Sequence, residues 1–464
     1  MSAIITDPFK KQVLDNVVNE VKNLTARYYV GIGKNDQWNS TETVPTPTDT
    51  PKTIRATQSA LQSVKAVAGA SFVIPRYNWA SGSIYNGYDD NISAIPSNTY
   101  YVLTEDNEVY ICLQQSKSST GSPNPSTVKP TTATKTKAFK TSDGYTWKFL
   151  YSLSASRASA FLSANFVPVE KIDSAGQAGL DVSGVEQGQV ADSAVEGRIL
   201  NIVITNGGTG YTSNPTVTIT GNSGAIGDSA QATAEISGGA VTKIDMLNES
   251  AGSGKNFINA TVTISSGGGS GATARAVIGP PKGIGKDPRD ELKSTSLMFN
   301  SKPSGAEDGN FLVGTNQDFR QVTLIRNPRT DSDDGTILTA NTAKALKFLI
   351  ADSAFATQLS TDELITNSLT PPANAYVNQV VNFGAATGGG MKVFYHQTDS
   401  TGFTPFSIGD TLTDEGSTTG TISVVADSNE LYLNNTGEVL YIENRAPVIR
   451  ASEQTEDIKV VISL

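Results

Sequence analysis

The chain has 464 residues, a formal net charge of −10 at pH 7, 42 Gly and 20 Pro. The acidic balance excludes a surface built for nucleic acid, which needs clustered Lys and Arg. Hydrophobic residues make up 38% of the chain, which excludes a disordered protein and suits roughly three domains of about 150 residues. The many Gly and Pro residues favour turn-rich β structure.

The N-terminal segment predicts an amphipathic helix. Asp7 suits the N-cap and Pro8 the first helical position. An apolar stripe with spacings of three or four residues follows: Phe9, Val13, Val17, Val21 and Leu24. A second short helix is expected over residues 56–69, closed by Gly69, after a Pro/Thr loop over 46–53. We expect neither a signal peptide nor a membrane span, because no apolar run is long enough.

Short strands are predicted from Phe72 onward. Residues 98–115 predict a hairpin with a polar turn at Glu105–Asn107, and residues 143–153 an aromatic strand. The stretch from 116 to 140, rich in Ser, Thr, Pro and Lys, predicts an exposed loop. Cys112 is the single cysteine, which excludes an intramolecular disulfide; its strand-like neighbours favour a buried apolar role.

An internal repeat begins near Gly188. Ile202 matches Ile244, and the segment PTVTI at 215–219 matches ATVTI at 260–264, an offset of about 40 to 45 residues. Each copy is expected to hold about four short strands joined by Gly turns. We interpret the pair as a small β module inserted into a host domain.

The rest of the chain predicts one more helix and further strands. Residues 342–358 favour a helix with Ala343, Leu346, Leu349 and Ile350 on one face. Residues 377–432 predict short strands with Gly turns, a second β insertion. In the last residues Ile458, Val460, Ile462 and Leu464 alternate, which predicts a strand with one buried face.

No motif in the sequence points to catalysis. Gly267–Ala272 satisfies the spacing of a dinucleotide-binding loop, but no helix follows it. The acidic run from Asp331 does not keep the spacing of a calcium loop. The single histidine, His396, lies near no nucleophile motif, and a zinc site with several His ligands is excluded. Paired carboxylates remain an open alternative; otherwise we expect neither catalytic residues, cofactor nor metal.

The expected fold is mainly β, an α+β host of elongated, multi-domain β-sandwich architecture with short N-terminal helices and inserted Gly/Thr-rich β modules. The predicted division is a host domain over 1–186, an inserted module over 187–282, continued host over 283–345, a second insertion of a helix and a β module over 346–436, and closing strands over 437–464.

Four segments carry a resemblance to a known family: FVIPRYNW (72–79), DGYTWKFLYSL (143–153), DFRQVTLIRNP (318–328) and GEVLYIENRAPVIRASEQTEDIKVVISL (437–464). Together, and in this order, they resemble the baseplate wedge subunit of T-even-type contractile-tailed bacteriophages. GIGKNDQW (31–38) is a weaker match. The resemblance covers about residues 5–186, 288–334 and 437–464, and the two insertions depart from it.

The resemblance implies a non-enzymatic, mainly β homodimer of the virion tail baseplate. It would assemble in the host cytoplasm, contact other wedge subunits, and bind neither nucleic acid nor membrane. A receptor- or glycan-binding tail adhesin is the alternative, motivated by the Gly/Thr-rich repeats; a depolymerase using two carboxylates is a further one.

The shared segments supply candidate structural or interface residues. Arg445 beside Glu443 is expected to hold a carboxylate bidentately in a partly buried elbow, and Pro447 to occupy an edge or bulge position. Aromatic residues at the segment centres suit core packing, with a subunit contact as the alternative. The candidates are Trp79, Tyr145, Trp147, Arg320, Asn327, Glu443, Asn444, Arg445 and Pro447.

Overall fold

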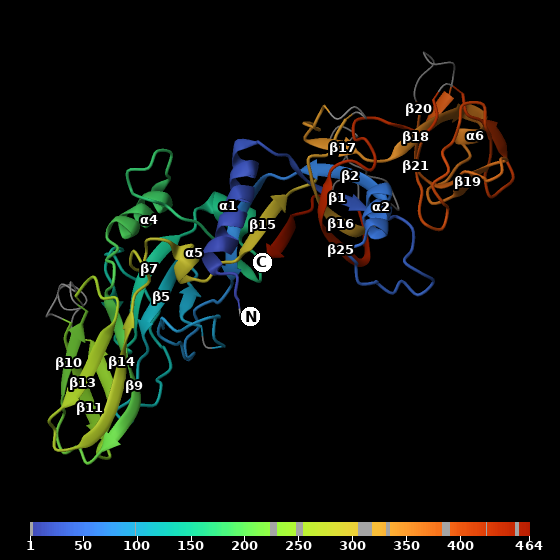
Figure 1. Ribbon diagram of the computed structural model, residues 1–464. Coiled ribbons are helices and arrows are strands. Elements are labelled where there is room, and N and C mark those ends of the chain that lie inside the picture. The colour runs from blue at the N-terminus through green and yellow to red at the C-terminus, as the bar shows by residue number, and fades with distance from the viewer. Residues whose placement is uncertain are drawn as a thin grey trace. The chain divides into compact units, whose positions relative to one another are not determined.

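The computed structural model describes residues 3–97, 99–222, 230–246, 254–304, 318–330, 335–382, 390–423, 425–450 and 454–464. The structure is mainly β, with 40% strand and 12% helix, which confirms the expected fold class. The chain divides into two compact units (Figure 1). The first contains residues 1–14, 71–297 and 463–464, and the second residues 15–70 and 298–462.

The first unit contains an aromatic four-stranded antiparallel sheet of order β4-β5-β7-β6. The hairpin β4–β5 turns where the sequence predicts it, and Asn107 adopts a φ of 59° there. Cys112, Tyr145 and Trp147 belong to its buried core. The strands are β4 (Tyr101–Leu103), β5 (Glu108–Gln114), β6 (Phe139–Lys140) and β7 (Thr146–Ser152), and the neighbouring helices are α3 (Ala155–Phe161), α4 (Val182–Asp192) and α5 (Pro288–Glu291).

The two sequence repeats fold into one six-stranded sheet, which we call the repeat module (residues 199–278). Its order is β12-β11-β10-β13-β14-β9, and the two edge strands β12 and β9 also lie against each other. Exchanging the copies reverses this order, so the repeats are related by a pseudo-twofold axis between β10 and β13. The strands are β9 (Ile199–Thr209), β10 (Thr216–Gly221), β11 (Ala232–Ser237), β12 (Ala240–Met246), β13 (Ala260–Ser265) and β14 (Ser270–Ile278).

Each described copy therefore supplies three strands rather than the four expected. The first strand of the first copy, β9, is 11 residues long and pairs along β14 from Thr209 to Ile199. Strand β9 is therefore longer than the short strands that the sequence predicts for each copy. Apolar side chains alternate inward, including Ile202, Ala234 and Ile244, so the repeat module has its own core.

The second unit contains a five-stranded antiparallel sheet of order β17-β2-β1-β16-β25. Its strands come from distant parts of the chain, and all six residues of β1 are buried. Tyr29, Val64 and Ile325 share one core cluster. The strands are β1 (Tyr28–Gly33), β2 (Leu61–Ala66), β16 (Asp318–Arg326), β17 (Thr342–Lys344) and β25 (Glu438–Ile449); α2 (Pro51–Ser59) precedes β2.

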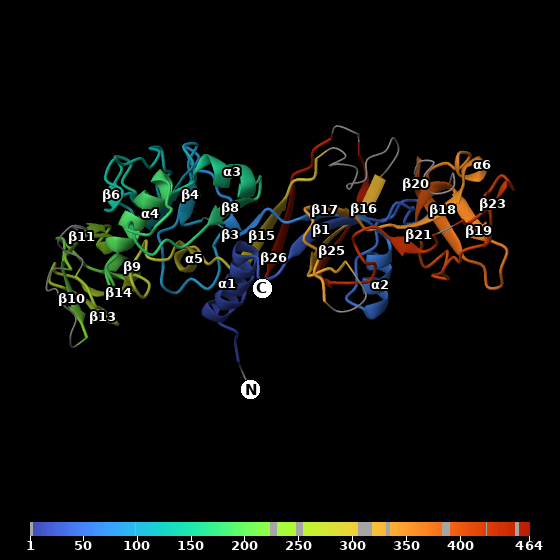
Figure 2. The same cartoon turned by 90° about the horizontal axis from the view of Figure 1, so that it is seen from above.

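A seven-stranded antiparallel sheet of order β23-β22-β19-β20-β21-β18-β24 follows in the second unit. The short helix α6 (Ser353–Ala356) packs against β18 and β21 (Figure 2). The strands are β18 (Lys347–Asp352), β19 (Leu364–Asn367), β20 (Asn374–Asn382), β21 (Gly390–His396), β22 (Thr411–Thr413), β23 (Thr419–Thr421) and β24 (Ser428–Asn429).

A second four-stranded sheet has the order β26-β15-β3-β8. Like helix α1 (Asp7–Asn23), the strands β3 (Gly69–Pro75), β15 (Ser296–Ser301) and β26 (Ile458–Ser463) each contain residues of both units; β8 is Phe166–Val169. In β26, Val460 is buried, whereas Leu464 beyond its end is 47% exposed. The predicted alternation therefore holds in the middle of the strand and fails at the last residue.

The helix predicted over 342–358 is wrong: the segment forms β17, β18 and the single turn α6. In β18, Phe348 and Ile350 belong to one core cluster, together with the preceding Leu346, whereas Leu349 and Ala351 belong to another. Because both faces are buried, the apolar run is nearly continuous and imitates a helical pattern. Residues 347–352 form a strand rather than a helix because they pair with β21 and β24.

The other two helix predictions need smaller corrections. Helix α2 starts at Pro51, where the Thr50 hydroxyl accepts a hydrogen bond from Thr53 N, and residues 61–66 are strand rather than helix. Helix α1 forms as predicted, but its buried residues are Lys11 and Leu14. The predicted stripe is largely exposed, with Phe9 at 61% and Leu24 at 58%.

Candidate functional site

The aromatic candidates lie in and beside the core of the β4-β5-β7-β6 sheet. Tyr145 and Trp147 have no exposed surface, and their rings stack with centroids 5.8 Å apart. The Tyr145 hydroxyl donates to the Asn124 carbonyl at 2.6 Å. Trp79 packs against the same cluster, and its indole N–H donates to the Ser126 hydroxyl at 3.1 Å. These contacts fit the core-packing interpretation for Tyr145 and Trp147.

The bidentate geometry expected of Arg445 occurs at other arginines of the shared segments. Arg320, Arg326 and Arg450 each donate to both oxygens of one carboxylate. Arg320 lies on β16, is 4% exposed, and donates to both carboxylate oxygens of Glu42. Its guanidinium also donates to the buried carbonyl of Asn35 and lies 2.9 Å from the Asp318 carboxylate. Arg320 thus ties the loop that follows β1 to β16 through charge-assisted hydrogen bonds.

The bidentate pair expected of Arg445 in a partly buried elbow does not form with Glu443. The two side chains are each 39% exposed and approach only to 3.7 Å, in a single contact. The cause is a bulge in β25: Gln321 pairs with Asn444 and Phe319 pairs with Val448, so three residues of β25 stand opposite Arg320. Pro447 lies in this bulge on an edge strand, as predicted.

Asn444 and Asn327 have structural hydrogen bonds. Asn444 accepts from the Gln321 side-chain amide at 2.7 Å and donates to the Pro45 carbonyl at 2.8 Å. Asn327 adopts a φ of 50° directly after β16, and its side chain accepts from Arg27 N at 2.8 Å. Asn tolerates this left-handed conformation better than most residues, which explains its place at the turn.

A buried polar cluster around His396 went unnoticed in the sequence. His396 Nδ1 lies 2.7 Å from Asn378 Oδ1, and Nε2 lies 3.6 Å from Asp36 Oδ1. Burial raises the pKa of Asp36, but the interactions with His396 and Lys34 outweigh it and lower the pKa to about 2. Asp36 lies about 360 positions before His396, so no local sequence pattern predicts the cluster.

The remaining sequence motifs have structural roles. Gly267–Ala272 forms the tight turn between β13 and β14, where Gly267, Gly268 and Gly271 have positive φ, and a strand rather than a helix follows. Cys112 is buried as expected, and burial raises the pKa of its thiol. The acidic run from Asp331 to Asp334 lies outside the described residues.

The described part of the chain contains neither a cluster of metal-ligating side chains nor a helix suited to span a membrane. Among the described residues, no group of three or more His, Cys, Asp or Glu side chains is arranged to hold a metal ion. No helix in the described ranges is long and apolar enough to cross a membrane.

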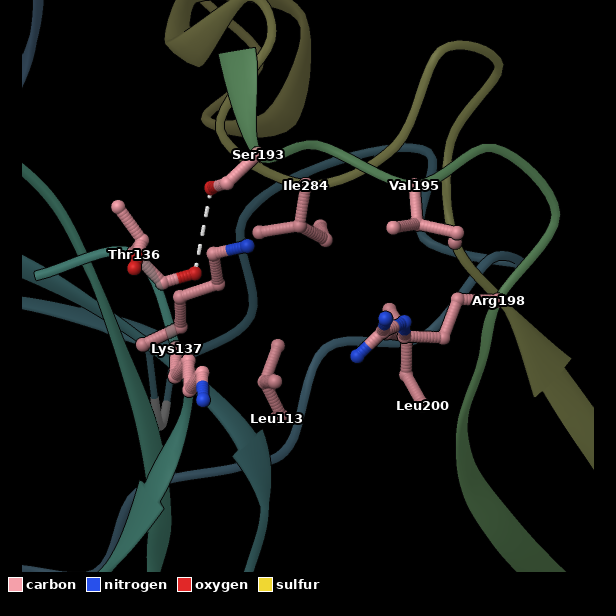
Figure 3. Close-up of a pocket in the computed structure, with 10 residues that line it drawn as sticks. Leu113, Thr136, Lys137, Ser193, Val195, Arg198, Leu200 and Ile284 are labelled. Carbon is pink, nitrogen blue, oxygen red and sulfur yellow. Dashed lines mark hydrogen bonds between the residues drawn. The ribbon is translucent and has the colours of Figure 1, made fainter. Parts of the chain in front are cut away.

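A cationic pocket in the first unit is the second feature missed in the sequence (Figure 3). It has a volume of about 160 Å³ and an apolar floor that includes Leu113, Leu200 and Ile284. Three basic side chains line it: Lys137, Lys148 and Arg198. They come from the loop before β6, from β7 and from the link between α4 and β9, so only the fold gathers them.

Comparison with known proteins places this chain in no family. A scan against models of protein families finds no match, and a search of the curated proteins finds none.

Proposed function

We propose that this chain is a structural subunit of the baseplate wedge of a contractile phage tail, which homodimerises and docks other wedge subunits. One observation carries the proposal. Segments 318–328 and 437–464, which carry the resemblance and lie more than 100 residues apart, supply the neighbouring strands β16 and β25 of one sheet, and the weaker match 31–38 begins with the last three residues of the next strand, β1. A resemblance scattered by chance along the chain has no reason to assemble in this way.

The geometry of the two β modules supports the same proposal. At the base of the repeat module, Gly279 N donates to the Arg198 carbonyl at 2.8 Å, so the chain enters and leaves at one point. In the seven-stranded sheet, Lys347 of β18 pairs with Asn429 of β24, which again places the two ends side by side. Modules whose ends meet can be inserted into a sheet-forming chain without displacing the strands that flank them.

The function would be mechanical: extended interfaces hold neighbouring subunits in one arrangement and rearrange during tail contraction. The charged clasp formed by Arg320, Glu42 and Asp318 suits this role, because it fixes a loop to a sheet without any bound ligand.

An adhesin is the second candidate, favoured by one surface of the repeat module. Strands β10 and β13 pair three exposed hydroxyl residues directly across from three others. These pairs are Thr216 with Ser265, Thr218 with Thr263, and Thr220 with Thr261. A row of hydroxyls on a sheet can hydrogen-bond to the hydroxyls of a glycan.

Sedimentation and co-purification test the proposal. The full chain should sediment as a dimer at micromolar concentration, and when co-expressed with the other baseplate proteins of its phage it should purify in a complex with wedge subunits. A strict monomer that retains no wedge protein contradicts the proposal. A glycan array probed with the same full chain distinguishes the adhesin from the wedge subunit, because specific glycan binding would favour the adhesin.

A further inference from the structure

The pocket in Figure 3 is lined by basic side chains from three separate segments of the first unit. Its three basic side chains, Lys137, Lys148 and Arg198, are joined by no acidic residue among the described residues that line it. By contrast, another pocket of the same unit sets Asp89 and Asp245 beside its basic residues. In a chain with a net charge of −10, three converging cations form a local positive site that attracts anions.

The basic groups differ in their access to solvent. Lys148 is only 8% exposed, Arg198 is half-buried, and Lys137 is exposed at the rim. Figure 3 shows the Arg198 guanidinium extending into the hollow. A buried ammonium and a guanidinium in an apolar hollow interact with an anion more strongly than the same groups in open water.

Two backbone carbonyls at or beside the pocket already accept hydrogen bonds from a side chain of the protein. The Ser193 hydroxyl donates to the Thr136 carbonyl at 3.2 Å and to the Val190 carbonyl at 2.8 Å, at the C-terminal end of α4. These bonds occupy carbonyls that would otherwise repel an anion. The buried acid Glu291 does not line the pocket, and one of its oxygens accepts from Gly285 N at 2.7 Å and from Asp287 N at 3.2 Å. Burial raises the pKa of Glu291, and its electrostatic interaction with Lys148 acts against that rise.

We infer that this pocket binds a small oxyanion of the phosphate or carboxylate class, held by Lys148 and Arg198 with Lys137 at the entrance. The volume of about 160 Å³ is far above the ~10–15 Å³ that one water molecule needs, so a tetrahedral oxyanion and residual water fit together. Arg198 supplies planar, paired donors, and Lys148 supplies a point charge.

Isothermal titration of the full chain with inorganic phosphate tests the inference, at fixed pH and with ionic strength held constant by sodium chloride. A parallel titration with glutarate, which imitates an acidic side chain, identifies the source of the anion. Saturable binding of either probe is expected. Tighter phosphate binding assigns the site to a free phosphate, and tighter glutarate binding assigns it to a carboxylate. Binding of neither probe overturns the inference.

Variants locate the binding. Arg198→Gln and Lys148→Met should each weaken binding on the order of tenfold, the loss that accompanies one charge-assisted hydrogen bond. Arg445→Gln is the matched control: it removes the same charge from an exposed side chain outside the pocket and should leave the affinity unchanged. Equal weakening in all three variants would show a general charge effect and overturn the assignment.

Lys137→Gln keeps the test decisive if the buried substitutions unfold the protein. Lys137 is exposed, so its replacement should preserve the fold, and the affinity should fall about threefold because an exposed charge contributes less. Unchanged affinity in Lys137→Gln, with circular dichroism showing a native fold, would place the anion elsewhere.

Discussion

The five-stranded sheet of the second unit and the repeat module of the first are both antiparallel, yet the chain builds them in opposite ways. The repeat module takes six strands from 80 consecutive residues, 199–278. The five-stranded sheet takes strands that begin at residues 28, 61, 318, 342 and 438. The repeat module is local in sequence, whereas the five-stranded sheet depends on segments that meet only in the folded chain.

Burial differs in the same way. Strands β10 and β13 alternate between exposed and half-buried residues, as in a sheet with one face in water. Strand β16 has seven consecutive buried residues from Phe319 to Ile325, because both its faces are covered. The comparison teaches that long-range assembly here goes with deep burial, so the same substitution should cost more in the five-stranded sheet.

The largest expected effect compares Ile325→Ala with Ile264→Ala. Ile325 has no exposed surface, and its replacement should lower the free energy of unfolding by about 2–5 kcal/mol. Ile264 is half-buried in the repeat module, and the same change should cost about 1–2 kcal/mol. Hydrogen exchange measured by mass spectrometry, with urea unfolding, assigns each loss to its sheet. Equal costs would break the comparison.

A buried carboxyl gives the second effect, at a contact between distant segments. Glu291 is 1% exposed, and burial raises its pKa to about 7, while its carbonyl accepts from the Tyr100 hydroxyl. The folded chain therefore binds a proton more tightly than the unfolded chain, whose Glu pKa is about 4.3, so stability is lost as pH rises from about 4.3 to 7.

The replacement Glu291→Gln should remove that loss, which amounts to at most roughly 4 kcal/mol. Melting temperatures recorded from pH 4 to pH 8 should fall less steeply in the variant than in the parent chain. Asp245→Asn in the repeat module, where the carboxylate is ion-paired to Lys243 at 2.7 Å, serves as the control. Parallel pH profiles for Glu291→Gln and the parent would contradict this account.

The third prediction compares Arg320 and Arg445, two arginines of the shared segments. Arg320→Ala leaves the buried Asn35 carbonyl without its donor and should cost about 1–3 kcal/mol. Arg445→Ala removes one long, exposed contact and should change the free energy of unfolding by less than about 0.5 kcal/mol. Thermal unfolding of both variants checks the order, and a larger loss for Arg445→Ala would reverse the assignment.

The smallest effect is expected from removing the whole repeat module. Because the ends of residues 199–278 meet, a short Gly linker can replace them, and the rest of the chain should stay folded. The loss includes surface ion pairs of Arg275 with Asp89 and Asp90, worth about 1 kcal/mol or less. Circular dichroism and hydrogen exchange of the shortened chain check this; global unfolding would show that the module is not autonomous.

Sequence reasoning predicted most of the local β structure and little of the candidate sites. The hairpin at Glu105–Asn107 and the strand around Trp147 follow from alternation and turn residues, which act over a few positions. Residues 342–358 were misassigned because β18 is buried on both faces, so its apolar run has no period of two. Lys137, Lys148 and Arg198 carry no motif that links them.

The sequence by itself determined the mainly β class, the presence of a repeat within 187–282 and an edge or bulge position for Pro447, because composition, self-similarity and proline geometry act locally. Only the tertiary structure decided that Arg320 and Arg450 are buried, that a histidine and an aspartate meet across 360 residues, and that three cations share one pocket. These features depend on strand pairing between distant segments, whose partners and register are set by burial of the whole sheet rather than by any short stretch.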